Sequence, residues 1–370
     1  NGGDGEDFYY TPPTGYKALN TNNLSAPAIA DPGKHFNTIA YQGNGTAISI
    51  TGVGFQPDLV WAKNRTGTYA TRDHKLFNVI SGANNYLESD TTDAEASFGT
   101  GVSFDSDGFT LNGDYGINPP SGTTTVAWNW KAGGTAVSNT DGTITSSVSA
   151  NPTAGFSIVS YTGNGTSGAT FGHGLSQAPE LVIIKNREST SGTSASAGWV
   201  VYSEPVGNTK YLYLNESNAE AIDSGRFNDT TPSASVVTLG DDGVVNNIED
   251  FIAYCFHSVE GYSKVGSYTG NASADGVFIY TGFRPAYVLA KSYDYSYDWP
   301  IIDNQRDPYN VISKGFNAAT NSAELDNAAN NVDFVSNGFK LRSNHTMFNG
   351  SHNYIYLAFA ESPFKTSNAR

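Results

Sequence analysis

Short segments that alternate apolar and polar residues open three stretches of the chain. The segments end at Tyr41, Tyr161 and Tyr268, and each tyrosine stands two residues before a Gly-Asn pair. Alternation with a period of two is typical of a β-strand that buries one face. Glycine and asparagine tolerate the positive φ angles of tight turns. The pattern therefore predicts a strand followed by a turn at all three places.

A continuous apolar run follows a proline in each of the same stretches. The apolar residues are 59–62, 181–184 and 286–290, and a lysine follows each run. Proline cannot donate a hydrogen bond inside a β-ladder, but it is tolerated at the first residue of a strand. A strand whose sequence does not alternate is expected to be covered on both faces. We therefore expect three central strands here.

The order of these landmarks indicates an internal repeat. The three tyrosines are 120 and 107 residues apart, and further landmarks follow in the same order in each copy. They are Ala94-Glu95, Ala219-Glu220 and Ala323-Glu324, then Asp107-Gly108, Asp242-Gly243 and Asn337-Gly338, and finally aromatic segments at 126–130, 251–256 and 354–359. One copy holds six to eight short strands in roughly 100 residues, which is the size of a two-sheet sandwich.

We predict an all-β fold of three tandem β-sandwich repeats, of jelly-roll or lectin-like type, with little helix. The expected boundaries are an extended N-terminal docking segment at 1–33, repeat 1 at 34–134, a linker at 135–149, repeat 2 at 150–261 and repeat 3 at 262–370. The glycine-rich stretch 133–142 is expected to be a flexible joint. Repeats 2 and 3, separated only by 257–261, are expected to be joined rigidly.

Composition narrows the class of protein. The 40 glycines and 15 prolines favour many turns over long helices. A net charge of −15 argues strongly against a sequence-independent nucleic-acid binder and makes an anionic membrane surface an unfavourable partner. No apolar run reaches the roughly 18 residues of a membrane span, so no membrane insertion is expected. Cys255 is the single cysteine, so no internal disulfide can form, which favours a bacterial or viral surface protein.

Catalytic motifs are missing from the sequence. Histidines at metalloprotease spacing, a G-x-S-x-G elbow and a phosphate-binding loop are all absent. We therefore predict a non-enzymatic protein with no catalytic residue, no metal site and no cofactor.

The charged residues that do recur are interpreted as structural. A glutamate that is present in all three copies is expected to pair with the lysine of its own copy, so that the predicted pairs are Lys63 with Glu95, Lys185 with Glu220 and Lys291 with Glu324. The alternative is that each lysine protects a strand edge while each glutamate is solvated.

One segment favours binding. Tyr293, Tyr295, Tyr297 and Trp299 alternate along the chain, so an extended backbone would place the four rings on one side. Rigid amphipathic rings are good contacts for sugars or protein partners. The alternative is that these rings pack against a neighbouring sheet or subunit.

The landmarks together resemble a family of marine tailed-phage proteins. The resemblance rests on Tyr10 to Leu24, on Val53 to Trp61, Phe104 to Leu111 and Val126 to Gly134, and on the later segments Phe156 to Tyr161, Tyr254 to Gly261 and Tyr354 to Glu361. In that family a tandem β-repeat domain of unknown function usually follows a SPRY/concanavalin-like module in tail-fibre, tail-spike and virion-surface proteins. The resemblance implies a virion structural or host-attachment role and transfers no catalytic or binding residue.

We therefore expect a bacteriophage virion structural protein, a fibre, spike or capsid-surface module at the virion surface, in host attachment or particle decoration. Its expected partners are other virion proteins and copies of itself, as a homotrimer, together with a host cell-surface glycan. Tandem repetition and low charge suit an exposed rod. The alternatives are a secreted carbohydrate-binding or carbohydrate-active protein, which a pair of carboxylates lining one cleft would support, and a bacterial surface adhesin.

Overall fold

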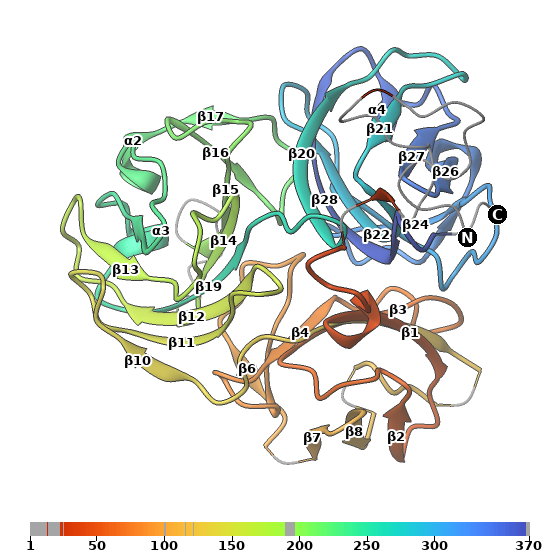
Figure 1. Ribbon diagram of the computed structural model, residues 1–370. Helices are drawn as coiled ribbons and strands as arrows, with labels where there is room; N and C mark the ends of the chain where they lie inside the picture. The colour runs from red at the N-terminus through yellow and green to blue at the C-terminus, as the bar shows by residue number, and fades with distance from the viewer. Residues whose placement is uncertain are drawn as a thin grey trace.

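The computed structural model describes residues 23–367 apart from Ser25, Thr100, Tyr115, Ser121 and 189–196, and it also describes Pro13. Within these residues the fold is all-β, as the sequence predicts. Paired strands form antiparallel sheets, and the helices are single turns of three or four residues. Most of the expected N-terminal docking segment lies outside the described residues. Figure 1 shows three lobes arranged around a common centre.

Lobe 1, rust red to gold in Figure 1, contains the 3-10 turn η2 and nine strands among the described residues. Its six-stranded sheet runs in the order β1-β9-β3-β4-β5-β6, and a second sheet runs β2-β8-β7. The elements are η2 (Pro32–Lys34), β1 (Phe36–Gln42), β2 (Ala47–Thr51), β3 (Leu59–Asn64), β4 (Lys75–Asn78), β5 (Asn85–Leu87), β6 (Ala96–Ser97), β7 (Val102–Asp105), β8 (Gly108–Asn112) and β9 (Thr124–Trp130).

Lobe 2 contains an eight-stranded sheet in the order β10-β11-β12-β19-β14-β15-β16-β17 and a two-stranded sheet β13-β18. Its elements are β10 (Val137–Asn139), β11 (Ser146–Asn151), β12 (Phe156–Thr162), β13 (Thr170–Gly172), β14 (Leu181–Asn186), β15 (Trp199–Ser203), β16 (Lys210–Tyr213), β17 (Ala221–Ile222), α2 (Ser224–Phe227), β18 (Val236–Thr238), α3 (Gly243–Asn246) and β19 (Asp250–Phe256).

Lobe 3, teal to blue in Figure 1, has a six-stranded sheet β20-β28-β22-β23-β24-β25 and a three-stranded sheet β21-β27-β26. Its elements are β20 (Ser263–Thr269), β21 (Phe278–Tyr280), β22 (Phe283–Ser292), β23 (Pro300–Asp303), β24 (Lys314–Asn317), β25 (Leu325–Asp326), η3 (Ala328–Asn330), β26 (Val332–Val335), β27 (Gly338–Leu341), α4 (Thr346–Asn349) and β28 (Asn353–Pro363).

One strand order recurs in the three large sheets. The order β1-β9-β3-β4-β5-β6 corresponds to β12-β19-β14-β15-β16-β17 and to β20-β28-β22-β23-β24-β25. The register of the central pair also corresponds, because each lysine faces an apolar residue of the neighbouring strand: Lys63 faces Val126, Lys185 faces Ile252 and Lys291 faces Ile355.

The three central strands are buried along their whole length, which confirms that both faces are covered. In β3, Val60 and Ala62 point to a core shared with the small sheet, where Ile50 of β2 and Phe109 of β8 also lie. The neighbouring residue Trp61 points instead to the centre of the molecule. Because successive side chains of a strand alternate between faces, a sheet with two apolar faces needs an unbroken apolar run.

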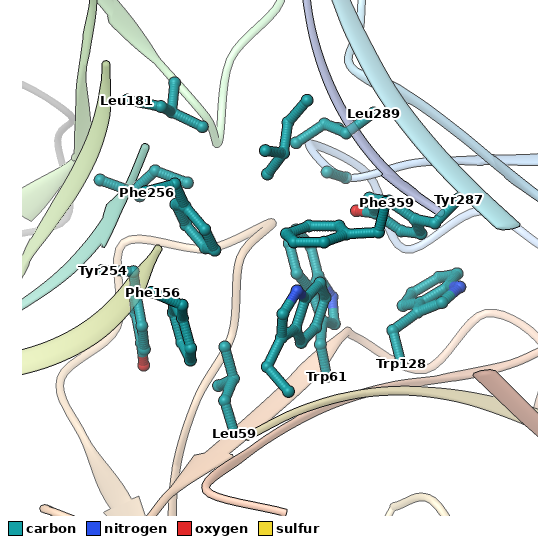
Figure 2. Packing of buried hydrophobic residues seen from close by; sticks show 14 of the residues in the cluster. Leu59, Trp61, Trp128, Phe156, Leu181, Tyr254, Phe256, Tyr287, Leu289 and Phe359 are labelled. Carbon is teal, nitrogen blue, oxygen red and sulfur yellow. The ribbon is translucent and has the colours of Figure 1, made fainter. Parts of the chain in front are cut away.

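The central core is built by all three lobes (Figure 2). Phe36 of lobe 1 stacks on Phe359 of lobe 3 with ring centroids 4.8 Å apart, and Phe256 of lobe 2 meets Phe359 edge-on at 6.1 Å. Trp128 meets Tyr287 edge-on at 5.8 Å. The cavity left at this centre is about 20 Å³, far below the volume of a ligand pocket. The lobes therefore close around one packed core instead of following one another along a rod.

The expected linker at 135–149 contributes to lobe 2. Strands β10 and β11 extend the large sheet, with Val148 of β11 facing Val159 of β12. Two of the three glycines of the expected joint are packed closely: a Cβ on Gly133 would lie 2.4 Å from the Ala150 carbonyl oxygen, and one on Gly142 would lie 2.3 Å from that of Thr170. These glycines allow close backbone approach, which differs from the flexible role expected for them.

One of the repeated dipeptides has a different structural position in lobe 2 than in lobes 1 and 3. Gly108 and Gly338 each begin the second strand of a hairpin, β7-β8 and β26-β27, as a dipeptide of this type predicts. Asp242 instead caps α3, where its side chain accepts from the Val244 amide. Lobe 2 has α2 in the region where the other lobes have the first strand of this hairpin. Asp242-Gly243 is therefore not structurally equivalent to Asp107-Gly108 and Asn337-Gly338, although the sequences match.

Candidate functional site

The predicted aromatic stripe does not form one surface. Only Tyr295 of the four residues is exposed, at 45%, and its ring stacks on His352 at 4.2 Å. Trp299 belongs to the central core, Tyr293 packs against that core, and Tyr297 packs against the core of lobe 3. The backbone between β22 and β23 bends after Ser292, so the alternation of an extended strand is lost. The alternative interpretation, packing against neighbouring sheets, describes three of the four rings.

The three repeated lysines are fully buried. Each Nζ donates to main-chain carbonyls: Lys63 to Asn64 and Ala70, Lys185 to Asn186 and Thr92, and Lys291 to Ser217 and Tyr297. Burial lowers the pKa of each lysine to about 8, because the charged ammonium loses its water.

The repeated glutamates contact other partners than the predicted lysines. Glu95 of lobe 1 accepts two hydrogen bonds from Arg187 of lobe 2, and Glu324 of lobe 3 accepts two from Arg65 of lobe 1. Glu220 pairs with Lys210 of its own lobe. The ion pairs formed by the described residues do not include a pair between a repeated glutamate and a repeated lysine. Two of these three ion pairs, those of Glu95 and Glu324, cross from one lobe to another, so they join the lobes instead of pinning a loop within one.

The main chain forms the same contact at all three seams, where a seam is the boundary between two neighbouring lobes. The glutamate amide of one lobe donates to the carbonyl of the residue two positions after the lysine in another lobe. The three bonds are Glu95 to Arg187 at 2.7 Å, Glu220 to Tyr293 at 2.7 Å and Glu324 to Arg65 at 3.2 Å. The series runs from lobe 1 to lobe 2, from lobe 2 to lobe 3 and from lobe 3 back to lobe 1, so the contacts close into a ring.

A second ring of contacts uses one side chain from each lobe. In lobe 2 it is Trp199, which faces Lys185 at the start of β15, and in the other lobes it is the residue just before β4 or β23. Trp199 donates its indole N–H to the Glu88 carbonyl at 2.9 Å, and Trp299 donates to that of Tyr213 at 2.8 Å. In lobe 1 the corresponding residue is His74, whose Nε2 lies 3.2 Å from the Asn317 carbonyl oxygen. Its Nδ1 accepts from the Trp61 indole, which can only donate, so Nε2 carries the proton of the neutral ring. Burial holds the pKa of His74 well below its usual value.

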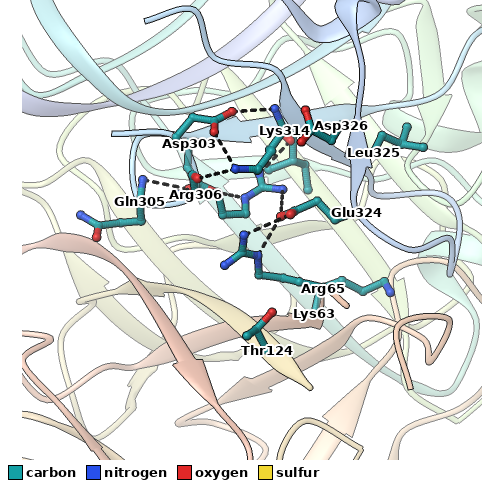
Figure 3. A network of polar contacts seen from close by, with 12 residues as sticks. Lys63, Arg65, Thr124, Asp303, Gln305, Arg306, Lys314, Glu324, Leu325 and Asp326 are labelled. Carbon is teal, nitrogen blue, oxygen red and sulfur yellow. Dashed lines mark hydrogen bonds and ion pairs between the residues drawn. The ribbon is translucent and has the colours of Figure 1, made fainter. Parts of the chain in front are cut away.

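The seam between lobes 1 and 3 holds a charged network (Figure 3). Arg306 is buried; its Nε donates to Asp303 at 2.6 Å and its Nη1 donates to Glu324 at 3.4 Å. Asp303 also accepts from the Trp128 indole of lobe 1 at 3.0 Å. Glu324 is shared with Arg65. Buried charges are tolerated when they are paired and hydrogen-bonded, which each group of this network satisfies.

Sequence reasoning missed a recurring buried asparagine. Asn118, Asn246 and Asn349 are each 0% exposed. The side-chain oxygen accepts from the amide of Asn44, Asn164 or Asn271, which is the asparagine of the Gly-Asn turn, at 2.8–2.9 Å. The amide groups donate to main-chain carbonyls of the same loops. The signal was available, because an asparagine precedes each closing aromatic segment.

A hollow of about 330 Å³ opens on the surface of lobe 1. It is lined by Arg72, Asp73, Lys75, Phe98, Asp114 and Gly116. The Arg72 guanidinium lies over the Tyr69 ring at 4.3 Å and its Nη1 donates to Asp114 at 2.6 Å. Behind the hollow, burial and then the neighbouring Asp73 carboxylate raise the pKa of Asp90 to about 7. Two carboxylates and two cations thus line one concave site.

The described residues give little support for a metal site or a reactive thiol. Groups of three or more His, Cys, Asp or Glu side chains that could hold a metal are not found among them. Cys255 is buried, and burial raises the pKa of its thiol to about 12, which keeps it protonated. Within the same part of the chain, no helix is long and apolar enough to cross a membrane.

Comparison with protein families gives one result. Residues 31–363 match the family described as Domain of unknown function (DUF7483). The chain belongs to this family. Searches among curated proteins and among solved structures find no match.

Proposed function

We propose that this chain is a non-enzymatic structural module of a bacteriophage virion surface, a fibre, spike or capsid-surface element that serves host attachment or particle decoration. The description of the DUF7483 family carries no function, so the proposal rests on the sequence resemblance and on the arrangement of the lobes. We also propose that the three lobes are copies of one β-sandwich unit, of jelly-roll or lectin-like type. The common strand order and register support this second proposal.

The observation that carries the proposal is the closure of three lobes around one core within a single chain. The lysines that recur in the sequence are buried, and the recurring glutamates make main-chain contacts between lobes. Such an arrangement makes a rigid body whose outer loops are free to vary, which suits a particle-surface module.

The expected homotrimer stays a prediction. It rests on the resemblance to fibre proteins and on the large number of aromatic residues, 22 Tyr, 20 Phe and 5 Trp. Many of these rings fill the central core and the lobe cores. Exposed large rings still occur on lobe 3, at Phe278, Tyr280 and Tyr309. Association through these rings would remove apolar area from water.

The direct test is to locate the protein on the source particle. Purified virions are analysed by mass spectrometry and by cryo-electron microscopy, and the three-lobed shape is fitted to the surface density. The expected result is a stoichiometric amount of the protein and a density of this shape on the tail or capsid. Its absence from purified particles, with presence in the culture medium or on the host cell wall, would overturn the proposal in favour of a secreted protein or an adhesin.

A further inference from the structure

The hollow of lobe 1 borders the connection that follows the last strand of the large sheet, and this connection adds a helical turn in the other two lobes. Tyr86, Tyr211 and Gly315 hold equivalent positions, because each pairs with the first residue of the last strand of its large sheet. In lobe 2 the chain continues into α2, and the buried Arg226 lies over the Tyr211 ring at 4.8 Å and pairs with Asp242.

In lobe 3 the chain continues into η3, and Asn330 fills the space against Gly315. A Cβ on Gly315 would lie 2.9 Å from the Asn330 amide nitrogen, which itself donates to the Ser313 carbonyl at 2.8 Å. In lobe 1 only four residues separate β6 from β7, too few for such a turn and its connections. The connection after the last strand of the large sheet therefore adds a helical turn in lobes 2 and 3, whereas in lobe 1 it is short and its first residue, Phe98, lines the hollow.

The groups that line the open site are held in place before any ligand arrives. Arg72 is fixed by Tyr69 and Asp114, and Asp73 accepts from the Asn321 amide of lobe 3 at 3.1 Å. Lys75 lies over the Tyr86 ring at 4.1 Å and pairs with Glu88. Phe98 stacks on Tyr86 at 4.3 Å and is partly exposed. Groups held in this way lose little entropy when they bind.

The site also depends on a glycine. Gly116 has a φ of +75°, and a Cβ there would lie 2.9 Å from the Lys75 side chain. A larger residue would therefore both strain the backbone and displace the Lys75 side chain.

The chemistry of the lining selects a neutral ligand. Arg72 and Lys75 supply donors, Asp73 and Asp114 supply acceptors, and Glu88 beside Lys75 adds a further negative charge. The lining has no excess of positive charge to hold an anion, and the chain as a whole carries −15. Sugar hydroxyls both donate and accept, and a partly exposed aromatic ring offers a stacking face.

We infer that the hollow of lobe 1 binds a neutral saccharide. Its volume is at the lower end for small-molecule sites, which matches one or two sugar rings. The inference names a ligand class for the proposed attachment role and rests on that role for its biological meaning, while the binding itself is tested on the isolated protein.

The test is saturation-transfer NMR with the full chain and a panel of glucose, galactose, N-acetylglucosamine, maltose, lactose and chitobiose, each at about 10 mM, which detects millimolar binding. Glucose 6-phosphate and sialic acid serve as anionic probes. Arg72→Ala and Asp114→Asn remove half-exposed groups, so both variants are expected to fold. Arg342→Ala, which breaks a comparable Arg–Asp pair on lobe 3, is the matched control.

The expected result is a signal from at least one neutral sugar that falls at least about tenfold in Arg72→Ala and in Asp114→Asn and persists in Arg342→Ala, because binding that relies on charged hydrogen bonds loses about this much without one partner. No signal from any neutral sugar, a preference for the anionic probes, or equal binding by Arg72→Ala would overturn the inference. These outcomes leave the location of the protein on the particle unaffected, so the two proposals fail separately.

Discussion

Arg187 of lobe 2 donates two hydrogen bonds to the carboxylate of Glu95 in lobe 1, from Nε to Oε2 at 3.0 Å and from Nη2 to Oε1 at 2.8 Å. The Glu95 amide donates in return to the Arg187 carbonyl at 2.7 Å. Arg65 and Glu324 repeat this arrangement at another seam, with side-chain bonds of 2.8 and 3.0 Å. At the remaining seam Glu220 makes only the main-chain bond to the neighbouring lobe, while its carboxylate pairs with Lys210 of its own lobe. The main-chain contact is thus common to the ring, and the ion pair is added to two seams of three.

Replacing Glu95 with glutamine is expected to lower the free energy of unfolding by about 1–3 kcal/mol, because Arg187 then keeps its charge at a largely buried seam without a counter-ion. Urea unfolding followed by tryptophan fluorescence measures the change. Asp275→Asn is the control, since its pair with Lys340 is on the surface, with the aspartate side chain 85% exposed. Equal stability of Glu95→Gln and the parent chain would show that the ion pair adds nothing to the main-chain contact.

Replacing Trp299 with phenylalanine is expected to cost about 2–4 kcal/mol. The change removes the indole N–H that binds the Tyr213 carbonyl and leaves a void in the central core. Thermal unfolding measures the loss, with Tyr295→Phe as the control because Tyr295 is exposed. If the lobes unfold separately in the Trp299→Phe variant, the calorimetric transition splits; a single unshifted transition would contradict a role for this seam contact.

The strands were predictable because their causes are local. The residues from Phe36 to Tyr41 alternate because β1 buries only one of its faces. The apolar run that ends just before Lys63 is unbroken because both faces of β3 are buried. The Gly-Asn turns were also predicted, but for another reason: the residues of these pairs do not adopt a positive φ, and Gly43 and Gly163 instead allow close backbone approach. Each of these features depends on a few neighbouring residues of the chain.

The seams were not predictable in the same way. Arg187 and Glu95 are 92 positions apart, and their contact exists only because the lobes close into a ring. A sequence comparison between copies aligns equivalent residues, so it favoured the pairing of Lys63 with Glu95 inside one copy over contacts between copies. The residue two positions after the lysine differs between the copies, being Arg65, Arg187 or Tyr293. The sequence therefore does not reveal that its carbonyl accepts the same seam bond in each copy.

The hollow of lobe 1 was not predictable either. It arises from the short connection after β6, whereas β17 and β25 each lead into a helical turn.

Replacing Gly163 with alanine is expected to lower the free energy of unfolding by about 1–3 kcal/mol, because the new Cβ would lie 2.1 Å from the Asn247 carbonyl oxygen and the backbone must move. Gly243→Ala is the matched control in the same lobe. Its Cβ would meet only the Asn247 side chain at 3.8 Å, and the residue begins α3, where alanine is favoured. Chemical denaturation of both variants measures the difference, and equal stability of the two would contradict the close approach.

The buried lysines are expected to make the fold more stable as the solution becomes mildly alkaline. Burial lowers the pKa of Lys63, Lys185 and Lys291 to about 8, from 10.5 for an exposed lysine. Between these values the unfolded chain binds more protons than the folded chain, so the free energy of unfolding rises with pH. The gain in stability is complete above pH 10.5, the pKa of an exposed lysine, and it is lost as the pH falls through about 8, the pKa of the buried lysines. Above about pH 10 the effect is opposed, because burial raises the pKa of tyrosines such as Tyr202 to about 12.

The useful window is therefore about pH 8 to about pH 9.5, where most tyrosines of the unfolded chain are still protonated. Urea midpoints measured across this window should rise for the parent chain. Lys185→Met should flatten the rise by at least about a third, because one of three equivalent lysines is removed while the Cys255 thiol, whose pKa burial raises to about 12, opposes the rise in both chains. Lys264→Met is the control, because Lys264 is only half-buried on β20. A midpoint that stays flat or falls in the parent chain, or a slope that Lys264→Met reduces as much as Lys185→Met does, would show that the buried lysines are not the groups that titrate.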